Sequence, residues 1–388
     1  MLLKLEKVES YVLKPNQIVR APEYGRLVTF VPNKRLPIHS WFYFKEGFSR
    51  DLVVKMFELF GAKPGVRLLD PFCGSGTSLV VAKEFGLEAC GVDASPLAVF
   101  VSQVKTADYD IDVLEQTSER IFSKKFRRCE IGEVSWLTKA AFSKYALEDI
   151  AFFREEVRSI DDLKVRNFFT LALMNSANRV SYGLKDGSYI RIVKKPHPPL
   201  RKVFKRMVKR MIRDVKSTNY QPSNIKVYLG DARRLNFLPD EAYDIVVTSP
   251  PYLNKIEYTK VYRIEYELFF PEVKVDALRS YIGVNTEVDQ DPFPERNLPV
   301  AAKAYLRDVE LALQEIQRVC KESARLAIVV AEGAFPDQIV PCDLLIAELA
   351  AKLGFTVDKV LVAAERVVTR DRTVKIGKAR ESILLLQK

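Results

Sequence analysis

The sequence predicts an α/β protein with a doubly wound, mostly parallel sheet. Apolar strand-like segments alternate with amphipathic helical segments from residue 66 onward, which is typical of a sheet with helices on both faces. Glycines and carboxylates follow directly after several of these strands, where such sheets bind ligands. A long, mostly helical stretch at 106–222 interrupts the alternation. We therefore expect a main domain over 38–105 and 223–388, a helical insertion over 106–222, and a β-rich N-terminal segment over 1–37.

The first expected helix covers 49–61, with Ser49 as its N-cap and Gly61 at its end. Seven strands are expected at 66–70, 88–93, 225–231, 243–249, 325–333, 356–368 and 381–388. Helices are expected from about 77 to 86 and at 306–320 and 343–355. The last two strands lack a helical crossover between them, so they should be antiparallel. The prediction is a seven-stranded sheet with an antiparallel last strand and an insertion between its second and third strands.

Composition excludes several classes of protein. A chain of 388 residues with 48% hydrophobic content can bury a core, and it has no apolar run of about 18 residues to form a transmembrane helix. The N-terminus carries charges from Lys4 and lacks the apolar centre of a signal peptide, so we expect a cytoplasmic protein. The five cysteines form no C-x-x-C pair and only two histidines are present. We therefore expect neither a metal site nor a disulfide framework.

The net charge of +11 favours a polyanionic partner, with nucleic acid the default and no membrane. The clearest charge pattern is at 194–217, an expected amphipathic helix with Lys or Arg at 201, 202, 205, 206, 209, 210 and 213. Phosphate contact by Lys205, Arg206, Lys209 and Arg210 is the functional interpretation of this helix. A solvated charged face is the alternative.

A glycine-containing loop, "DPFCGSGT", follows the first strand. Gly74 and Gly76 permit a tight turn and close approach of a ligand to the backbone, and the helix that begins near Thr77 offers unpaired N–H groups. Two further strands end at carboxylates, in "GVDASP" and "GDARRL". Asp70, Asp93 and Asp231 thus stand at three successive strand ends, which predicts one shared crevice.

The fourth strand ends abruptly in "TSPPY", at Ser249, Pro250, Pro251 and Tyr252. The combination of DPFCGSGT, an acidic end to the second strand, and TSPPY resembles the S-adenosylmethionine-dependent amino-methyltransferases of nucleic acids. The order here resembles the branch of that family in which the cofactor motif comes first. The resemblance covers roughly 38–105 and 225–388 and implies a Rossmann-like methyltransferase fold.

The resemblance implies S-adenosylmethionine as the cofactor. It implies that Asp70, Gly74 and Gly76 border the methionine part, Asp93 the ribose and Asp231 the adenine. Segment 38–49 resembles the family's other cofactor segment, and Phe48 is its best candidate contact, as a cation–π partner of the sulfonium or simply as a core residue. The other expected cofactor-binding residues flank these positions and are Phe72, Cys73, Thr77, Ala94 and Ala232.

TSPPY suits the chemistry of an exocyclic base amine, which is a poor nucleophile. The Ser249 side chain and the Pro250 carbonyl can accept hydrogen bonds from the amine, and the two prolines hold that carbonyl in place. Tyr252 can stack on an extruded base. No cysteine follows the prolines, so a covalent attack on cytosine C5 lacks its nucleophile. In this family SPPY resembles enzymes acting on cytosine N4, whereas DPPY and NPPY occur more with adenine, guanine or protein glutamine.

The substrate remains open at this point. Tyr258 and Tyr262, in the aromatic segment 258–270, are candidates for the base pocket or for the core. The insertion could be the target-recognition region of a site-specific DNA enzyme. Its compact helical character and a composition typical of thermophiles favour structured RNA, possibly ribosomal. A protein methyltransferase and a non-catalytic nucleic-acid binder are less favoured.

Overall fold

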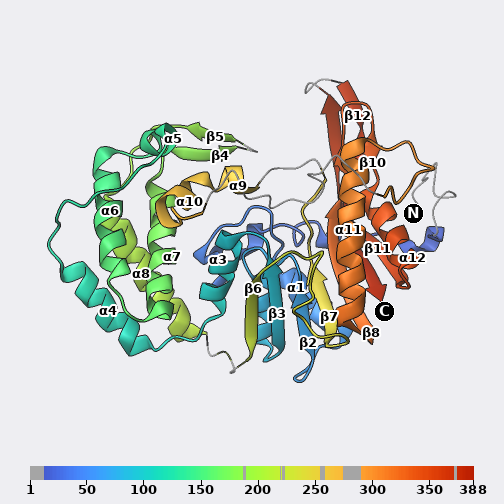
Figure 1. Ribbon diagram of the computed structural model, residues 1–388, viewed down its shortest axis with the longest axis horizontal. Helices are drawn as coiled ribbons and strands as arrows, with labels where there is room; N and C mark the ends of the chain where they lie inside the picture. Colours follow the sequence, from blue (N-terminus) through green and yellow to red (C-terminus); the bar gives the residue numbers. More distant parts are fainter. Residues whose placement is uncertain are drawn as a thin grey trace.

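The computed structural model describes residues 13–186, 189–218, 220, 223–253, 258–273, 290–370 and 374–388. One large sheet forms the middle of the molecule, with helices on both of its faces and a helical insertion at one side (Figure 1). The expected α/β, Rossmann-like methyltransferase architecture is confirmed. No helix in the described ranges is long and apolar enough to cross a membrane.

The main sheet has the order β1-β11-β12-β8-β7-β2-β3-β6. Strands β6, β3, β2, β7 and β8 are parallel neighbours, and β12 is antiparallel to both β8 and β11, as predicted for the last strand. The strands of this sheet are β1 (Ile18–Arg20), β2 (Arg67–Asp70), β3 (Glu88–Asp93), β6 (Ile225–Leu229), β7 (Tyr243–Thr248), β8 (Cys320–Ala331), β11 (Thr356–Arg370) and β12 (Val374–Gln387). Two short strands, β9 (Gly333–Ala334) and β10 (Ile339–Val340), pair separately.

Alternate residues of the central strands belong to two different cores. Ile245 and Val247 of β7 pack with α1 (Arg50–Phe60) and α2 (Thr77–Glu84), whereas Val246 packs with α11 (Val300–Val319) and α12 (Cys342–Lys352). This two-residue period is expected of a strand covered on both faces. Ser49 caps α1 by accepting from the Leu52 N–H, and Gly61 ends it in the left-handed region, as predicted.

The insertion has its own aromatic core, which includes Phe152, Phe153, Phe168 and Phe204. Its elements follow α3 (Pro96–Thr106) and are α4 (Ile111–Ser123), α5 (Trp136–Ala140), α6 (Lys144–Arg158), α7 (Leu163–Val180), β4 (Gly183–Asp186), β5 (Tyr189–Ile192) and α8 (Leu200–Ser217). Helices α9 (Tyr258–Val261) and α10 (Arg263–Phe269) come after β7 in the chain. Helix α10 nevertheless packs on the insertion, where Asn178 donates to the Glu265 carboxylate at 3.0 Å.

Several features of the structure differ from the prediction. The described part of the N-terminal segment contains one three-residue strand and 3-10 turns (Pro15–Gln17, Pro22–Tyr24, Val31–Arg35), followed by a further turn at His39–Trp41. Prolines interrupt strand pairing in this segment. Strand β1 nevertheless adds an eighth strand to the sheet by pairing in parallel with β11. The insertion also contains the β4–β5 hairpin, which a mostly helical reading missed.

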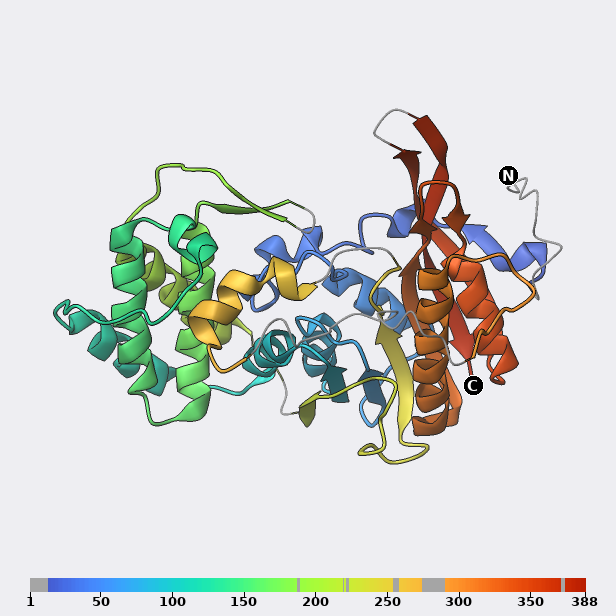
Figure 2. The same cartoon turned by 45° about the horizontal axis from the view of Figure 1, so that its top comes forward.

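Strands β11 and β12 are longer than expected. Their outer part rises beyond the rest of the sheet as a two-stranded hairpin (Figures 1 and 2). The parallel strands end at the upper edge of the sheet in Figure 1. The β4–β5 hairpin stands at one side of this edge, and the outer part of β11 and β12 stands at the other. These two hairpins therefore flank the place where a parallel sheet binds its ligands.

Candidate active site

A cavity of about 370 Å³ lies at the carboxyl ends of β2, β3, β6 and β7. It brings together residues from almost the whole length of the chain, from Val28 to Glu381. The predicted site residues that line it are Phe48, Phe72, Cys73, Gly74, Thr77, Asp93, Ala94, Asp231, Ala232, Ser249, Pro250, Pro251, Tyr252 and Tyr262. Asp70 and Gly76 do not line it, and their positions behind the wall are described below.

The glycine loop needs both of its glycines, for different reasons. Gly74 (φ 50°) and Gly76 (φ 76°) adopt the left-handed backbone conformation that side chains disfavour. Gly74 faces the cavity. A Cβ on Gly76 would lie 2.8 Å from the Ser102 Oγ, so Gly76 lets α2 begin against α3. No side chain caps α2, which leaves N–H groups at its start for a ligand.

Asp70 supports the site from behind. Its side chain is 1% exposed and accepts hydrogen bonds from the Thr248 Oγ1 at 2.6 Å, the Phe72 N–H at 3.2 Å and the Ser78 hydroxyl. Burial raises the pKa of this carboxyl to about 6, although these hydrogen bonds act to lower it. Asp70 therefore joins the loop after β2 to the residue that precedes Ser249.

Asp93 is held with its carboxylate in the cavity wall. One oxygen accepts from the Gly74 N–H and the other from the Ser95 N–H, both at 2.8 Å. Burial raises the pKa of Asp93 to about 6. Each carboxylate oxygen retains a lone pair for a ligand, which suits a pair of neighbouring hydroxyls.

Asp231 is paired with Arg233, which the sequence analysis did not identify. The Arg233 guanidinium donates to both Asp231 oxygens and also to the Asp308 carboxylate of α11 at 2.6 Å. Burial acts to raise the pKa of Asp231, but the hydrogen bonds from Arg233 outweigh it, and the net pKa is lowered. Asp231 is therefore a charged acceptor at neutral pH.

Segment 38–49 contributes more than Phe48. Phe48 is buried and lines the cavity. Phe44 and Glu46, which are half-buried, line it as well. Phe44 is stacked on Tyr262, with ring centroids 5.5 Å apart and an interplanar angle of 4°. Glu46 accepts from the Tyr262 hydroxyl at 3.1 Å, and its Oε1 is buried without a partner among the described residues. Burial raises the pKa of Glu46.

The TSPPY segment forms the other end of the cavity. Pro250 is buried, and Ser249, Pro251 and Tyr252 are half-buried. The Tyr252 hydroxyl donates to the Glu381 Oε1 of β12 at 2.9 Å. Glu381 lines the cavity, as does Arg366 of β11. The sequence analysis missed both residues, because each lies more than a hundred positions from TSPPY and in no recognisable motif.

The predicted substrate-binding residues do not lie together: Tyr262 is at the cavity, and the four basic residues are on α8. Tyr262 lines the cavity, and the Lys185 ammonium lies 3.9 Å from its ring centroid. Tyr258 lies in α9, but its side chain is outside the described residues. Lys205, Arg206 and Lys209 are exposed on α8, whereas Arg210 donates to the Ser40 Oγ at 2.6 Å.

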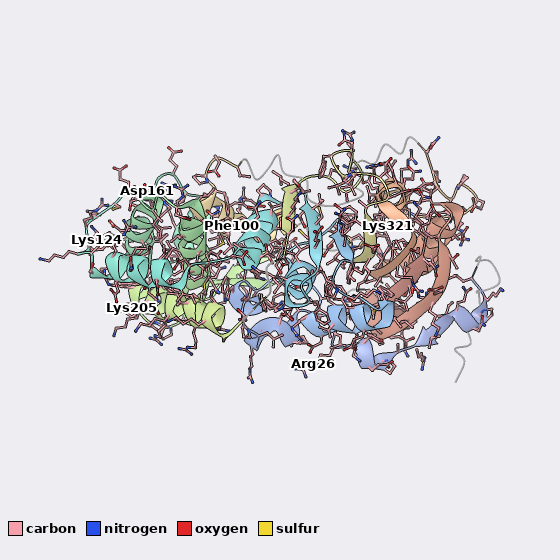
Figure 3. The ribbon with its side chains drawn as sticks, turned by 90° about the horizontal axis from the view of Figure 1, so that it is seen from below. Arg26, Phe100, Lys124, Asp161, Lys205 and Lys321 are labelled. Carbon is pink, nitrogen blue, oxygen red and sulfur yellow. The ribbon has the colours of Figure 1, made fainter. Side chains whose placement is uncertain are left out.

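Helix α8 lies away from the cavity. Lys205 is on the same side of the molecule as Arg26 (Figure 3), and no α8 residue lines the cavity. Within the described ranges, no group of His, Cys, Asp and Glu could hold a metal ion.

Comparison with known proteins gives whole-length similarity. The chain is 23% identical to the type II methyltransferase M.BsoBI of Geobacillus stearothermophilus, over 100% of this chain and 92% of that protein. It is 23% identical to M.AvaI of a Nostoc species (87% and 83% covered) and 25% identical to M.MvaI of Kocuria varians (75% of each). No family model matches the sequence. Solved structures with a similar fold are more distant; a SAM-dependent methyltransferase from Aquifex aeolicus has 11% identity and a TM-score of 0.30, covering 86% of this chain and 88% of that one.

The sheet order, the glycine loop and the carboxylates at the strand ends define an S-adenosylmethionine-dependent methyltransferase. The chain is similar over most of its length to type II methyltransferases, and its TSPPY segment resembles that of the S-adenosylmethionine-dependent amino-methyltransferases of nucleic acids.

The cavity residues fit this cofactor. The unpartnered Glu46 oxygen suits the ammonium of the methionine part, because a buried carboxylate oxygen is costly when it is left unpaired. Asp93 suits the ribose hydroxyls, and the Asp231 carboxylate suits the adenine amine. We therefore expect Glu46 to be an additional cofactor contact.

Proposed function

We propose that the protein methylates the N4 amine of cytosine in DNA, at a specific target site. The type II methyltransferases that it resembles over most of its length support DNA rather than the structured RNA favoured by the sequence analysis. A methyltransferase acting on adenine N6 in DNA is the alternative, because it would use the same cofactor and the same hydrogen-bond acceptors.

One observation carries the proposal. Ser249, Pro250 and Tyr252 line the same cavity as Asp93 and Asp231. A cofactor held by the strand-end carboxylates would therefore face the TSPPY segment across one continuous space. Asp70 accepts from both the Phe72 N–H and the Thr248 hydroxyl. These bonds favour a fixed distance between the glycine loop at the cofactor end of the cavity and the TSPPY segment at the base end.

The reaction needs an amine that points its nitrogen at the methyl group. The cofactor supplies an electrophilic methyl group on a sulfonium. The Ser249 Oγ and the Pro250 carbonyl accept the two amine hydrogens and so orient the nitrogen, and the fixed prolines make this geometry available before the base arrives. The Tyr252 ring stacks on the extruded base, which contributes roughly 1–3 kcal/mol. The proton lost from the methylated nitrogen passes to water.

Glu381 has a positioning role in this scheme. By accepting from the Tyr252 hydroxyl, it holds the ring at the cavity wall. A covalent attack on cytosine C5 is not part of the scheme, because the Cys73 thiol belongs to the glycine loop. Burial raises the pKa of that thiol well above its usual value, so it is not a thiolate.

The test is to identify the methylated nucleoside. The protein is incubated with methyl-deuterated S-adenosylmethionine and either genomic DNA that lacks the modification or folded ribosomal RNA, and the digested nucleosides are analysed by mass spectrometry. We expect labelled N4-methyldeoxycytidine from DNA only, and none with a Ser249→Ala protein that still binds the cofactor.

The other outcomes are equally informative. Labelled N6-methyldeoxyadenosine would establish the alternative base. Label in RNA alone would reject DNA as the substrate. Label on cytosine C5 would reject the mechanism, because that reaction requires a nucleophile which the scheme does not contain.

A further inference from the structure

We propose that duplex DNA binds to one end of the insertion, which we call the aromatic–basic surface. It comprises α5, the start of α6, the β4–β5 hairpin and the segment that follows β5. Its side chains are Trp136, Lys139, Lys144, Tyr145, Tyr189, Arg191, Lys194 and Lys195. This inference rests on the proposed function and adds to it the surface that presents the DNA to the cavity.

The aromatic residues of this surface are unusually exposed. Trp136, Tyr145 and Tyr189 are 77%, 79% and 79% exposed, whereas the next large apolar side chain of the described residues, Leu229, is 60% exposed. All three belong to the same end of the insertion. Exposed Trp and Tyr side chains grouped in this way are typical of binding surfaces, and aromatic side chains pack against deoxyribose or insert between base steps.

The charge of this surface is complementary to phosphate. Segment 134–147 contains no Asp or Glu, and segment 182–202 contains one, Asp186, against several Lys and Arg. Lys139, Lys144, Arg191, Lys194 and Lys195 are all exposed. Lys and Arg contacts to phosphate position a protein on DNA, and the cations of these two segments outnumber the carboxylates within and directly beside them, Glu133, Glu148 and Asp186.

Hydrogen bonds hold the parts of this surface together. The Tyr182 N–H donates to the Ala141 carbonyl at 2.7 Å, and the Val193 N–H donates to the Tyr182 carbonyl at 2.8 Å. These bonds join the α5–α6 turn to both sides of the β4–β5 hairpin. The Ser135 and Thr138 hydroxyls at the start of α5 both donate to Glu267 of α10. The surface is therefore a fixed unit attached to α10.

The same hairpin reaches the cavity wall. Lys185 of β4 forms an ion pair with Glu265 and lies over the ring of Tyr262, which lines the cavity. The β11–β12 hairpin stands on the other side of the sheet edge (Figures 1 and 2). Its Arg366 is exposed and also lines the cavity. A duplex that lies on the aromatic–basic surface and extends toward Arg366 would pass over the cavity mouth.

The basic face of α8 is a weaker candidate for this role. Its exposed residues are charged, but its apolar residues, such as Phe204 and Met207, are buried in the insertion core. Lys205 lies on the same side of the molecule as Arg26 (Figure 3), whereas α5, β4 and β5 form the upper end of the insertion in Figure 1. We expect this face to contribute at most general attraction to phosphate.

Intrinsic fluorescence tests the proposal directly, because the chain has two tryptophans and Trp41 is only 1% exposed. Acrylamide quenching of the full-length protein should therefore report mainly on Trp136. We expect saturation with a 25-bp mixed-sequence duplex to lower this quenching severalfold, and Trp136→Phe to abolish the response. Unchanged quenching at saturation, measured by anisotropy of labelled duplex, would overturn the proposal. Protection that depends on protein concentration without DNA would also overturn it, because the surface would then join two copies of the chain.

Variants then compare the two basic surfaces. Lys194→Gln with Lys195→Gln should lower the salt dependence of duplex affinity by about 0.9 in slope per lost phosphate contact, and Tyr189→Ala should weaken binding about tenfold. Lys63→Gln with Lys359→Gln, at the opposite edge of the sheet, is the matched control and should change neither. Cofactor affinity, measured by calorimetry, should be unchanged in all of them.

The outcomes separate this inference from the proposed function. If the wild-type protein methylates DNA but only Lys205→Gln, Arg206→Gln and Lys209→Gln weaken binding, the aromatic–basic surface is wrong and the proposed function stands. If the wild-type protein neither binds nor methylates DNA, the proposed function fails and this inference fails with it.

Discussion

The two ends of the cavity are built in different ways. At the cofactor end, Gly74, Asp93 and Asp231 lie at or shortly after the carboxyl ends of β2, β3 and β6, which are neighbours in the sheet, and backbone N–H groups hold Asp93. At the base end, Tyr252 depends on Glu381, which lies 129 residues further along the chain. Local sequence thus specifies the cofactor end, whereas tertiary contacts complete the base end. We expect mutations at the two ends to separate cofactor binding from methyl transfer.

The largest expected effect is at the base end. Ser249→Ala removes a preorganised acceptor for the amine, so kcat should fall about 10²–10³-fold, by analogy with the loss of one directed hydrogen bond in other active sites. Single-turnover transfer to DNA measures this loss, and calorimetry measures cofactor affinity, which should stay the same. A matching fall in cofactor affinity would show that the two ends are not separable.

The next effect is at the cofactor end. Asp93→Ala removes one or two hydrogen bonds from a charged acceptor, each worth roughly 1.5–3 kcal/mol, so cofactor affinity should fall at least about tenfold. Calorimetry with S-adenosylmethionine measures it, and thermal unfolding checks that the variant is folded. An unchanged dissociation constant would remove Asp93 from the site.

Cofactor affinity should also depend on pH. The pKa of Asp93 is raised to about 6, so the carboxylate becomes protonated as pH falls through about 6 and can accept from fewer hydroxyls. Affinity should therefore be constant above pH 7 and fall by up to about tenfold per pH unit below 6. The same titration on Asp93→Asn should lack most of this dependence. Asp70 has a similar pKa and the pKa of Glu46 is also raised, so Asp70→Asn and Glu46→Gln are the controls that identify the responsible group.

The smallest effect should come from Glu381→Gln. The amide still accepts from the Tyr252 hydroxyl but without charge, which weakens that bond by about 1 kcal/mol and should lower kcat about fivefold. The fluorescence of 2-aminopurine placed beside the target base of a duplex would report reduced base extrusion. Cofactor affinity should be unchanged. If Glu381→Gln weakens the cofactor instead, Glu381 belongs to the cofactor end.

The sequence predicted seven of the eight strands described in the main sheet and about half of the cavity lining, because both follow from short-range patterns. Alternating apolar segments place β2, β3 and β7, and the residues after them meet at one edge of the sheet. It did not predict Arg366 or Glu381, since nothing near them indicates which strand the end of the chain will pair with. The β4–β5 hairpin was missed for a related reason: its strands are four residues each, and their pattern is weak beside that of the flanking helices.

The position of Asp70 has a consequence for altering the enzyme's base preference. Its carboxylate is bonded to both the cofactor loop and Thr248, so residue 249 is attached to a rigid frame that is shared with the methyl-donor site. Replacing Ser249 by Asp, to imitate the DPPY pattern, would add a negative charge at the residue after Thr248, whose hydroxyl donates to the Asp70 carboxyl. The Asp70 carboxyl is already hard to ionise. A change of base preference would therefore require adjustment of Asp70, Ser78 and Thr248 together with position 249.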